Sequence, residues 1–231
     1  MIQNLKERLK SKPSTFLLIE MFMYELHLLN VRLMSRLSPF KRKKIRELKK
    51  KKNVKLHWGC GSTKLPGWTN IDGWKSPATD LVTDLRESIP LSNNSTSFIF
   101  TEHVLEHVTI EEGAKVLKEF YRILNTNGVA RIVVPDLELC CEAFIKGELS
   151  WFKKVGIPAQ SSTAGMGFNS IFYNHSHRYI YDYDSLVIML KEAGFKKISK
   201  SSFNGSIYEE LQIDKTDESR QLVSLYVEAI K

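Results

Sequence analysis

The chain of 231 residues is long enough for one sizeable domain with an extension, and its 42% hydrophobic and 26% charged residues are typical of an ordinary globular protein. Its three cysteines are odd in number and include no C-x-x-C pair, so the sequence predicts neither a disulfide framework nor a cysteine zinc site. Residues 1–52 hold 15 of the 34 Lys and Arg and 4 of the 26 Asp and Glu, a net charge of +11, whereas residues 53–231 carry −3. This asymmetry indicates a basic N-terminal arm (residues 1–52) with a partner of its own, attached to a body (residues 53–231).

The N-terminal arm is expected to form two helices. Residues 14–34 are strongly apolar and contain neither Gly nor Pro, which favours a helix. Glu20 and Glu25 interrupt the apolar run, and this argues against a membrane span or a signal peptide. Ser38-Pro39 then predicts the cap and first turn of a second helix, which continues into the basic run of residues 41–52.

The basic run KRKKIRELKKKK leaves three interpretations open. It is a solvated link between arm and body, or it meets an anionic lipid surface while the apolar helix lies in the interface, or it contacts nucleic acid. Nucleic acid is the less favoured partner, because no aromatic residues are interleaved with the basic ones. We therefore expect a cytoplasmic protein, with peripheral association at the inner membrane face as an option. The sequence does not indicate an oligomeric state.

The body, taken in chain order, alternates strand-like and helix-like segments, which predicts an α/β fold with a Rossmann-like, open and mostly parallel sheet. The link between the first two strands is short and contains Pro66-Gly67, so we expect a turn in place of the usual crossover helix. Residues 137–180 are rich in Gly and aromatic residues and are expected to be irregular. The seven predicted strands are residues 54–58, 68–71, 80–85, 97–101, 129–134, 195–202 and 221–230, and the predicted helices are residues 109–125 and 182–193.

The stretch Val54–Asp72 carries the main local signal of a binding site. A strand-like run is followed by the turn Gly59-Cys60-Gly61, and Asp72 ends the next strand. This order is typical of a nucleoside pocket at the carboxyl edge of an α/β sheet. By itself it fits a plain glycine turn between two strands equally well, so its interpretation depends on the rest of the chain.

Several further segments occur in an order that resembles a known family. They are LHWGCG, GWTNID, TDLRESIPLSNNSTSFIFTEHVLEH, LKEFYRILNTNGVARIVVPD and YDYDSLVIMLKEAGF. Together they make residues 54–231 resemble a class I S-adenosylmethionine-dependent methyltransferase of the methyltransferase type 11 group. The resemblance implies a seven-stranded Rossmann-like sheet, S-adenosyl-L-methionine as the cofactor, and methyl transfer as the reaction.

The resemblance also implies which residues surround the cofactor. Gly59 and Gly61 allow the backbone to approach the methionine part, where a Cβ would clash. Asp72 is placed to accept the ribose hydroxyls, and Asp84 with Leu85 to meet the adenine, although Asp80 is an alternative to Asp84. One departure is that Ser62-Thr63 stands where the family turn carries a further Gly. The full predicted set is Gly59, Cys60, Gly61, Asp72, Asp84, Leu85, Glu102 and His103.

Catalytic residues are less clearly indicated. Candidates for a general base are His103, His175, His177 and Asp136, of which His177 and His103 are the preferred pair. His103, Glu106 and His107 share one helical face, on which a metal site is possible, but a third ligand is not evident. We therefore expect Glu106 and His107 to brace the start of the following helix, and we predict no metal.

The acceptor is only broadly indicated. No N-P-P-Y or D-P-P-Y run follows the fourth strand, which disfavours methylation of the amino groups of bases. Relatives with GWxNxD and a late YD-x-x-S-L helix resemble methyltransferases of small molecules or saccharides, and the arm would suit a lipid-linked glycan. Two alternatives are open: a degenerate methyltransferase fold that serves as a binding or scaffold protein recruited by the arm, and an RNA methyltransferase.

Overall fold

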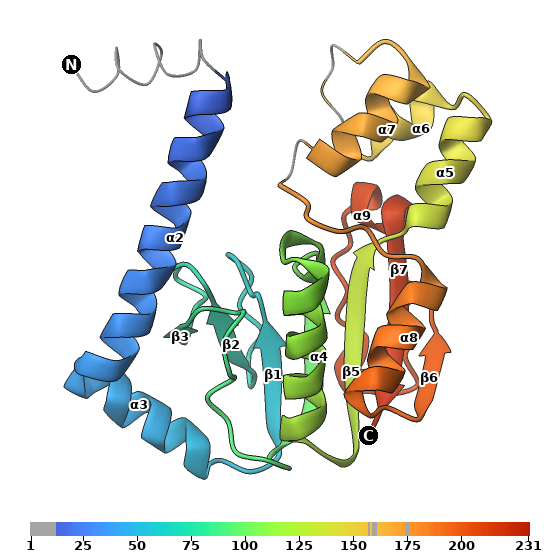
Figure 1. Ribbon diagram of the computed structural model, residues 1–231. Helices are drawn as coiled ribbons and strands as arrows, with labels where there is room; N and C mark the ends of the chain where they lie inside the picture. The colour runs from blue at the N-terminus through green and yellow to red at the C-terminus, as the bar shows by residue number, and fades with distance from the viewer. Residues whose placement is uncertain (1–12, 157, 159–160, 174–175) are drawn as a thin grey trace.

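The protein is described by a computed structural model that covers residues 13–156, 158, 161–173 and 176–231 (Figure 1). The chain begins with two helices, α2 (Pro13–Leu37) and α3 (Pro39–Lys50), which meet at Ser38. The Ser38 side chain accepts a hydrogen bond from the amide of Lys41 at 3.4 Å, and Pro39 occupies the first turn of α3. Both predicted helices of the arm and the predicted cap are therefore confirmed.

A seven-stranded sheet forms the centre of the body. Its order is β3-β2-β1-β4-β5-β7-β6, and all neighbouring pairs are parallel except those that include β7. This arrangement confirms the predicted Rossmann-like, mostly parallel sheet of seven strands. The strands are β1 (Val54–Trp58), β2 (Thr69–Asp72), β3 (Leu81–Val82), β4 (Thr96–Glu102), β5 (Leu124–Pro135), β6 (Lys197–Lys200) and β7 (Ser224–Ile230).

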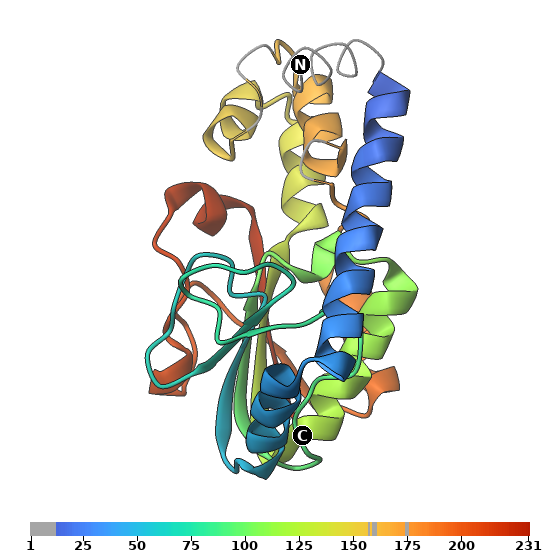
Figure 2. The same cartoon turned by 90° about the vertical axis from the view of Figure 1, so that its left-hand side faces the viewer.

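Helices cover one face of this sheet (Figure 2). Helix α4 (Ile110–Ile123) begins with a capping box, in which Thr109 and Glu112 each accept the backbone amide of the other, and its apolar stripe faces the sheet. Phe120 of α4 lies edge-on against Trp58 of β1, with ring centroids 5.4 Å apart. Helix α8 (Tyr183–Ala193) packs beside α4 and ends at Gly194, in the left-handed conformation expected of a helix C-cap.

The opposite face of the sheet is covered by loops and short turns. Residues 59–68, all of them described, contain no helix, although β1 and β2 are parallel neighbours, so the predicted loss of the crossover helix is confirmed. Apolar side chains from this link and from residues 203–213 pack on Phe100 and Val133. Beside them, Arg131 is fully buried and is neutralised by Asp214 and Glu228.

Two sequence predictions are corrected by the structure. Residues 137–180 are not irregular: they contain α5 (Leu137–Ile145), α6 (Leu149–Lys154) and α7 (Ala164–Tyr173), which pack together beyond the carboxyl end of β5. Residues 221–230 are not all strand either, because α9 (Glu218–Val223) occupies the start and β7 begins at Ser224. These helices are short and are held by aromatic contacts such as Phe144–Phe168, so they leave little periodicity to detect.

The N-terminal arm packs onto the body and is not a detached segment. Leu28 and Val31 of α2 are buried, and Leu48 of α3 belongs to the main apolar core with the strands. The boundary at residue 52 therefore does not mark a break in packing. None of the described helices, α2 included, combines the length and hydropathy that crossing a bilayer requires.

Candidate active site

A cavity of about 770 Å³ lies at the carboxyl ends of β1, β2 and β4. Helix α2 forms one of its walls, and the chain around residues 172–178 forms another. The carboxyl edge is where open α/β sheets bind their ligands. A volume in this range suits a cofactor together with part of a small second ligand.

The glycine turn after β1 is held close to β2. The amides of Gly59 and Cys60 both donate to the carbonyl of Ile71, at 2.9 and 3.0 Å. Gly59 has a φ of +77°, and a Cβ on it would lie 2.4 Å from Cγ2 of Val104, so no other residue fits there. Gly61 faces open space, with nothing within 4 Å of the position of its absent Cβ.

Cys60 contributes no side chain to the cavity. Its thiol is directed back to the carbonyl of Gly61, at 3.7 Å, and burial raises the pKa of the Cys60 thiol. The side chain is therefore part of the turn's packing. Only the backbone of Cys60 is available for contact with a ligand. The predicted cofactor-binding role of Cys60 is therefore limited to its backbone atoms.

Asp72 faces the cavity at the end of β2, as expected. One carboxylate oxygen accepts from the amide of Gly61 at 2.7 Å, and the other accepts from the amide of Trp74 at 2.8 Å. Each oxygen has a second lone pair, so the carboxylate can also accept two ligand hydroxyls. Asp72 thus fixes the turn and presents acceptors to the cavity, and its ribose-binding role stays a prediction.

Asp84 and Leu85 also line the cavity, whereas Asp80 does not. The buried carboxylate of Asp84 accepts from Nε of Arg86 at 3.1 Å and pairs with Nε of Arg32 at 3.2 Å. Asp80 accepts instead from Lys64 and from the amide of Asn70, both at 2.8 Å. Burial acts to raise the pKa of Asp80, but these hydrogen bonds outweigh it and hold the pKa at about 2. The geometry favours Asp84 over Asp80 as the adenine neighbour, which stays a prediction.

The wall contributed by α2 was missed from the sequence. The ring of His27 stacks on Trp74, with centroids 3.8 Å apart and planes at 3°, and its Nε2 lies 2.9 Å from the carbonyl of Gly73. Glu25 receives a bidentate ion pair from Arg86, at 2.7 and 2.9 Å. Glu25 and Arg86 are separated by 61 residues in sequence, so no local pattern could have paired them.

The histidines lie on another side of the cavity. His103 has a φ of +53°, and its Nε2 lies 2.8 Å from the hydroxyl of Ser224. Burial lowers the pKa of His103 to about 3, so its ring is neutral at pH 7 and is a weak base. His177 also lines the cavity, with Nδ1 at 2.6 Å from the carbonyl of Ile171. Both preferred catalytic candidates are therefore in place, and their roles stay predictions.

Two other predicted residues do not line the cavity, and a third is not described. Glu102 does not line the cavity, and its carboxylate accepts from the amide of Lys215 at 3.2 Å; its predicted contact with the cofactor stays a prediction. Asp136 caps α5 by accepting from the amide of Glu138 at 2.9 Å, and it is not a cavity residue. His175 lies outside the described residues.

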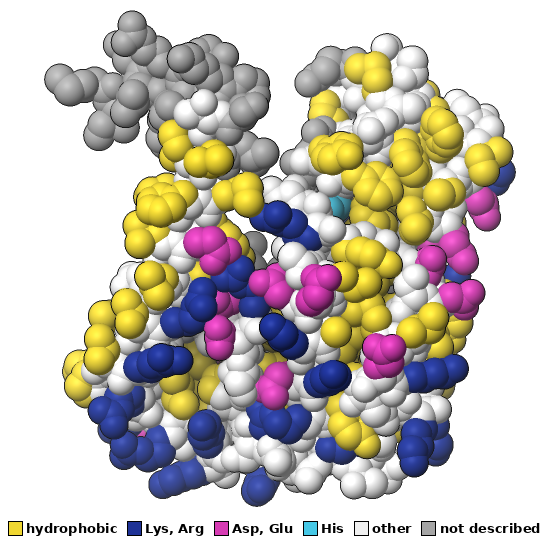
Figure 3. All heavy atoms as spheres, in the orientation of Figure 1, with side chains coloured by type: hydrophobic (Ala, Val, Ile, Leu, Met, Phe, Trp, Pro, Cys, Tyr) yellow, Lys and Arg dark blue, Asp and Glu magenta, His cyan; other side chains and the backbone are white. Residues whose placement is uncertain are grey.

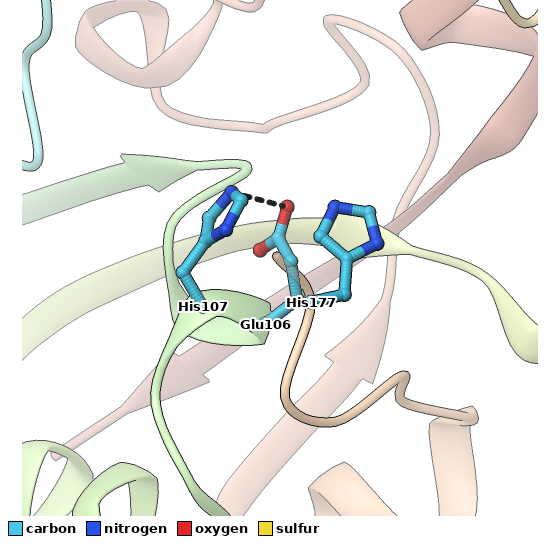
Figure 4. Close-up of side chains that lie close together, drawn as sticks. All are labelled: Glu106, His107 and His177. Carbon is cyan, nitrogen blue, oxygen red and sulfur yellow. Dashed lines mark ion pairs between the residues drawn. The ribbon is translucent and has the colours of Figure 1, made fainter. Parts of the chain in front are cut away.

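A carboxylate and two imidazoles meet beside this histidine wall (Figure 4). Glu106 is fully buried between His107 and His177, and one of its carboxylate oxygens and one ring nitrogen of each histidine lie within 4.8 Å of one another. Burial raises the pKa of Glu106 to about 8. The predicted bracing role of Glu106 and His107 does not describe the whole cluster, because His177 also lies against them. The three side chains together are of the types that can bind a metal ion.

Comparison with known proteins identifies the domain. Residues 56–132 match the model of a family described as a methyltransferase domain. Over these residues the chain is similar to a methyltransferase domain. The match includes most of β1, the glycine turn, Asp72, Asp84, His103 and His107, and the resemblance seen in the sequence implies S-adenosyl-L-methionine as the methyl donor. The comparison with curated proteins gave no match.

Several solved structures resemble this methyltransferase at low sequence identity. An S-adenosylmethionine-dependent methyltransferase from Archaeoglobus fulgidus is 16% identical, with a TM-score of 0.47, and the alignment covers 94% of this chain and 99% of that one. One from Thermotoga maritima, described as a possible histamine N-methyltransferase, is 17% identical, with a TM-score of 0.44 and 97% of each chain covered. Because these scores are below 0.5, the fold assignment rests on the strand order described above.

The residues of the cavity fit this cofactor. The open space at Gly61 admits a close backbone contact, and Asp72 offers acceptors for the ribose hydroxyls. Asp84 and Leu85 lie further along the same wall for the adenine. The bound cofactor supplies an already activated methyl group. The remaining task of the protein is to orient the acceptor in line with that methyl group and to exclude water.

Proposed function

We propose that this enzyme transfers a methyl group from S-adenosyl-L-methionine to a small-molecule or saccharide acceptor presented at an anionic membrane surface. The observation that carries the proposal is the enclosure of the cavity. Met21, Tyr24 and Leu28 of α2 stand on one side of it, and Phe172 and Tyr173 at the end of α7 stand on another. Such walls admit a small molecule or a terminal sugar rather than a folded macromolecule.

The charge of the cavity walls bears on the choice between acceptors. Glu20 and Glu25 of α2 line the cavity, so a polyphosphate chain would approach carboxylates there. Backbone phosphates dominate the affinity of nucleic-acid binding proteins, which meet them with Lys and Arg. We therefore favour an uncharged acceptor such as a saccharide over RNA.

The exposed surface of the arm supports the membrane part of the proposal. A stripe along α2, here called the apolar stripe, is exposed and follows helical spacing; it comprises Leu18, Phe22, Leu26, Leu29, Leu33 and Leu37. Helix α3 continues from it with exposed Lys43 and Lys44 among other basic residues. Figure 3 shows the apolar side chains along α2 and the basic ones over α3 on the same view of the molecule. An apolar helix face beside clustered lysines is the composition of a surface that binds anionic lipid.

Vesicle sedimentation tests the membrane part. We expect the protein to sediment with vesicles that contain anionic phospholipid, and to be released by Lys43→Glu/Lys44→Glu or by salt, since each basic residue near an anionic surface contributes about 1 kcal/mol. The matched control is Lys153→Glu/Lys154→Glu on α6, an exposed basic pair away from the arm. Equal sedimentation of the arm variant and the α6 variant contradicts the proposal. A stable dimer of the wild type in light scattering, with the apolar stripe as its interface, contradicts it as well.

Labelled cofactor tests the acceptor class. The protein is incubated with methyl-labelled S-adenosylmethionine and with separate cell fractions of lipid-linked glycans, water-soluble metabolites and RNA. Label in either of the first two fractions supports the proposal. Label confined to RNA contradicts it and favours the RNA methyltransferase. No product with any fraction, together with absence of cofactor binding, favours a scaffold protein with a degenerate site.

A further inference from the structure

The short turn η1 (Leu105–His107) and the chain around His177 are tied together by the backbone. The amides of Arg178 and Tyr179 both donate to the carbonyl of Glu106, at 2.7 and 3.2 Å. This contact brings His177 against Glu106 and His107, from which it is 71 and 70 residues distant in sequence. The rings of His107 and His177 stand 5.0 Å apart, on either side of the Glu106 carboxylate (Figure 4).

The hydrogen bonds of the cluster fix which ring nitrogens carry protons. Nδ1 of His177 must donate to the carbonyl of Ile171, because a carbonyl only accepts, so Nε2 of the neutral ring holds the lone pair. The hydroxyl of Ser224 gives its one proton to the carbonyl of Arg220 at 2.5 Å, so Nε2 of His103 donates to that hydroxyl. The lone pair of neutral His103 is then on Nδ1, which lies 3.5 Å from Oε1 of Glu106.

The Glu106 carboxylate is the least satisfied group of this cluster. Neither oxygen of the Glu106 carboxylate has a hydrogen-bond partner among the described residues, although the side chain is fully buried. Nε2 of His107 is 3.9 Å from Oε1 of the same carboxylate. A buried carboxylate without donors is costly, and a cation beside the Glu106 oxygens would offset that cost.

We infer that Glu106, His107 and His177 bind a divalent first-row transition-metal ion, such as Zn²⁺, Mn²⁺, Fe²⁺ or Co²⁺. Two imidazoles and one carboxylate are a donor set that these ions accept with coordination positions left open. Bonds of about 2.0–2.2 Å in a tetrahedral arrangement place the ligands of one ion about 3.3–3.6 Å apart. The observed separations, all within 4.8 Å, meet this after a contraction of up to about 1.5 Å, which rotation of the side chains can supply. The carbonyl of Ile171 orients the His177 ring, as outer partners of metal-bound histidines do.

The open positions of the ion face the acceptor side of the cavity, since His103, His107 and His177 all line it. An acceptor hydroxyl bound there would lose its proton to solvent more readily, because a metal ion lowers the pKa of a bound oxygen. The oxygen would then form a bond to the methyl carbon, while the carbon–sulfur bond breaks and its electron pair remains on sulfur, giving the neutral thioether. This part of the inference rests on the proposed methyl transfer and selects a hydroxyl-bearing acceptor.

Metal binding can be measured without any activity assay. The full-length protein, prepared without a histidine tag and stripped with a chelator, is titrated with Zn²⁺, Mn²⁺ or Co²⁺ by calorimetry, and the Co²⁺ form is examined by visible absorption. We expect one ion per chain for the wild type. Glu106→Gln and His177→Ala should each weaken binding by at least about tenfold, the smallest loss found even for outer partners of metal ligands. Glu111→Gln is the matched control, because Glu111 is an exposed carboxylate nearby on α4.

Folding and cofactor binding are measured in the same samples. Circular dichroism melting shows whether each variant is folded, and the metal should raise the Tm of the wild type but not that of Glu106→Gln. Absence of metal binding to the wild type overturns the inference, as does equal binding by all folded variants. Cofactor binding without metal binding leaves methyl transfer standing, and metal binding without cofactor binding sinks methyl transfer alone.

Discussion

Gly59 shows how a single residue sets the position of the cofactor wall. Its positive φ turns the chain sharply after β1, and the absent Cβ leaves room for Val104. The turn thereby keeps its amides on the Ile71 carbonyl and places Gly61 beside Asp72. The same residue is thus required for packing and for the shape of the site.

Gly59→Ala is expected to destabilise the protein by about 2–5 kcal/mol, because a left-handed alanine costs about 1–2 kcal/mol and overpacking about 1–3 kcal/mol more. Urea denaturation measures the free energy of unfolding. Gly147→Ala is the control, since Gly147 also has a positive φ, +67°, but nothing lies within 4 Å of its Cβ position. Gly147→Ala should lose only the roughly 1–2 kcal/mol that the left-handed backbone conformation costs an alanine. Equal losses for the two variants would show that Val104 does not press on Gly59.

At the scale of elements, β1 carries a buried titratable group on the loop-covered side of the sheet. His57 is 3% exposed, and its Nδ1 lies 3.1 Å from the side-chain oxygen of Asn70. Burial lowers the pKa of His57 to about 4, against an ordinary value of 6.5. Between pH 6.5 and pH 4, His57 is therefore protonated in the unfolded chain but neutral in the folded chain. The free energy of unfolding falls as the pH drops through this range.

The contribution of His57 is expected to be full above pH 6.5 and to be lost progressively down to pH 4. Between pH 7 and pH 4.5 the loss amounts to about 2–3 kcal/mol for a shift of this size. The free energy of unfolding is measured by urea denaturation at the two pH values for the wild type and for His57→Gln. The contribution of His57 is the difference between the losses that the two proteins show on acidification. The same pH dependence in both proteins would show that His57 does not resist protonation.

Elements with regular periodicity could be predicted from the sequence. The sheet, α4 and α8 were predicted because their apolar residues recur with the period of the element, and the glycine turn and Asp72 because their spacing is typical of a nucleotide pocket. Helices α5, α6 and α7 were missed because they are short and are held by aromatic packing rather than by a stripe. The proposed metal ligands His107 and His177 could not be paired from the sequence, because a backbone contact at Glu106 brings them together.

At the scale of the whole molecule, the arm and the body form one packed unit around the cavity. The charge asymmetry of the sequence suggested a separate arm, yet Leu28 of α2 is 1% exposed and lies beside Gly73, the residue that follows β2. The α2 helix therefore has an inner side that closes the cavity and an outer apolar stripe that remains exposed. This division links the proposed membrane surface to access to the site.

Leu28→Ala tests whether the arm is docked in solution. Removal of a buried leucine is expected to cost about 2–5 kcal/mol of unfolding free energy, because it leaves a cavity between α2 and the body. Leu29→Ala is the matched control: Leu29 is the next residue on the helix and is 47% exposed, so a change within about 0.5 kcal/mol is expected. If both variants unfold at the same urea concentration as the wild type, α2 does not pack on the body.

The central claim, a cofactor cavity built on the Gly59 turn and Asp72, is tested most directly by calorimetric titration of S-adenosylmethionine. The wild type is expected to bind one cofactor per chain. Asp72→Ala should bind it about 10- to 150-fold more weakly, as loss of about 1.5–3 kcal/mol of hydrogen bonding to a charged group requires. Asp184→Ala, which removes an exposed aspartate on α8, should bind like the wild type. No binding by the wild type at millimolar cofactor, or unchanged affinity in Asp72→Ala, would contradict the account.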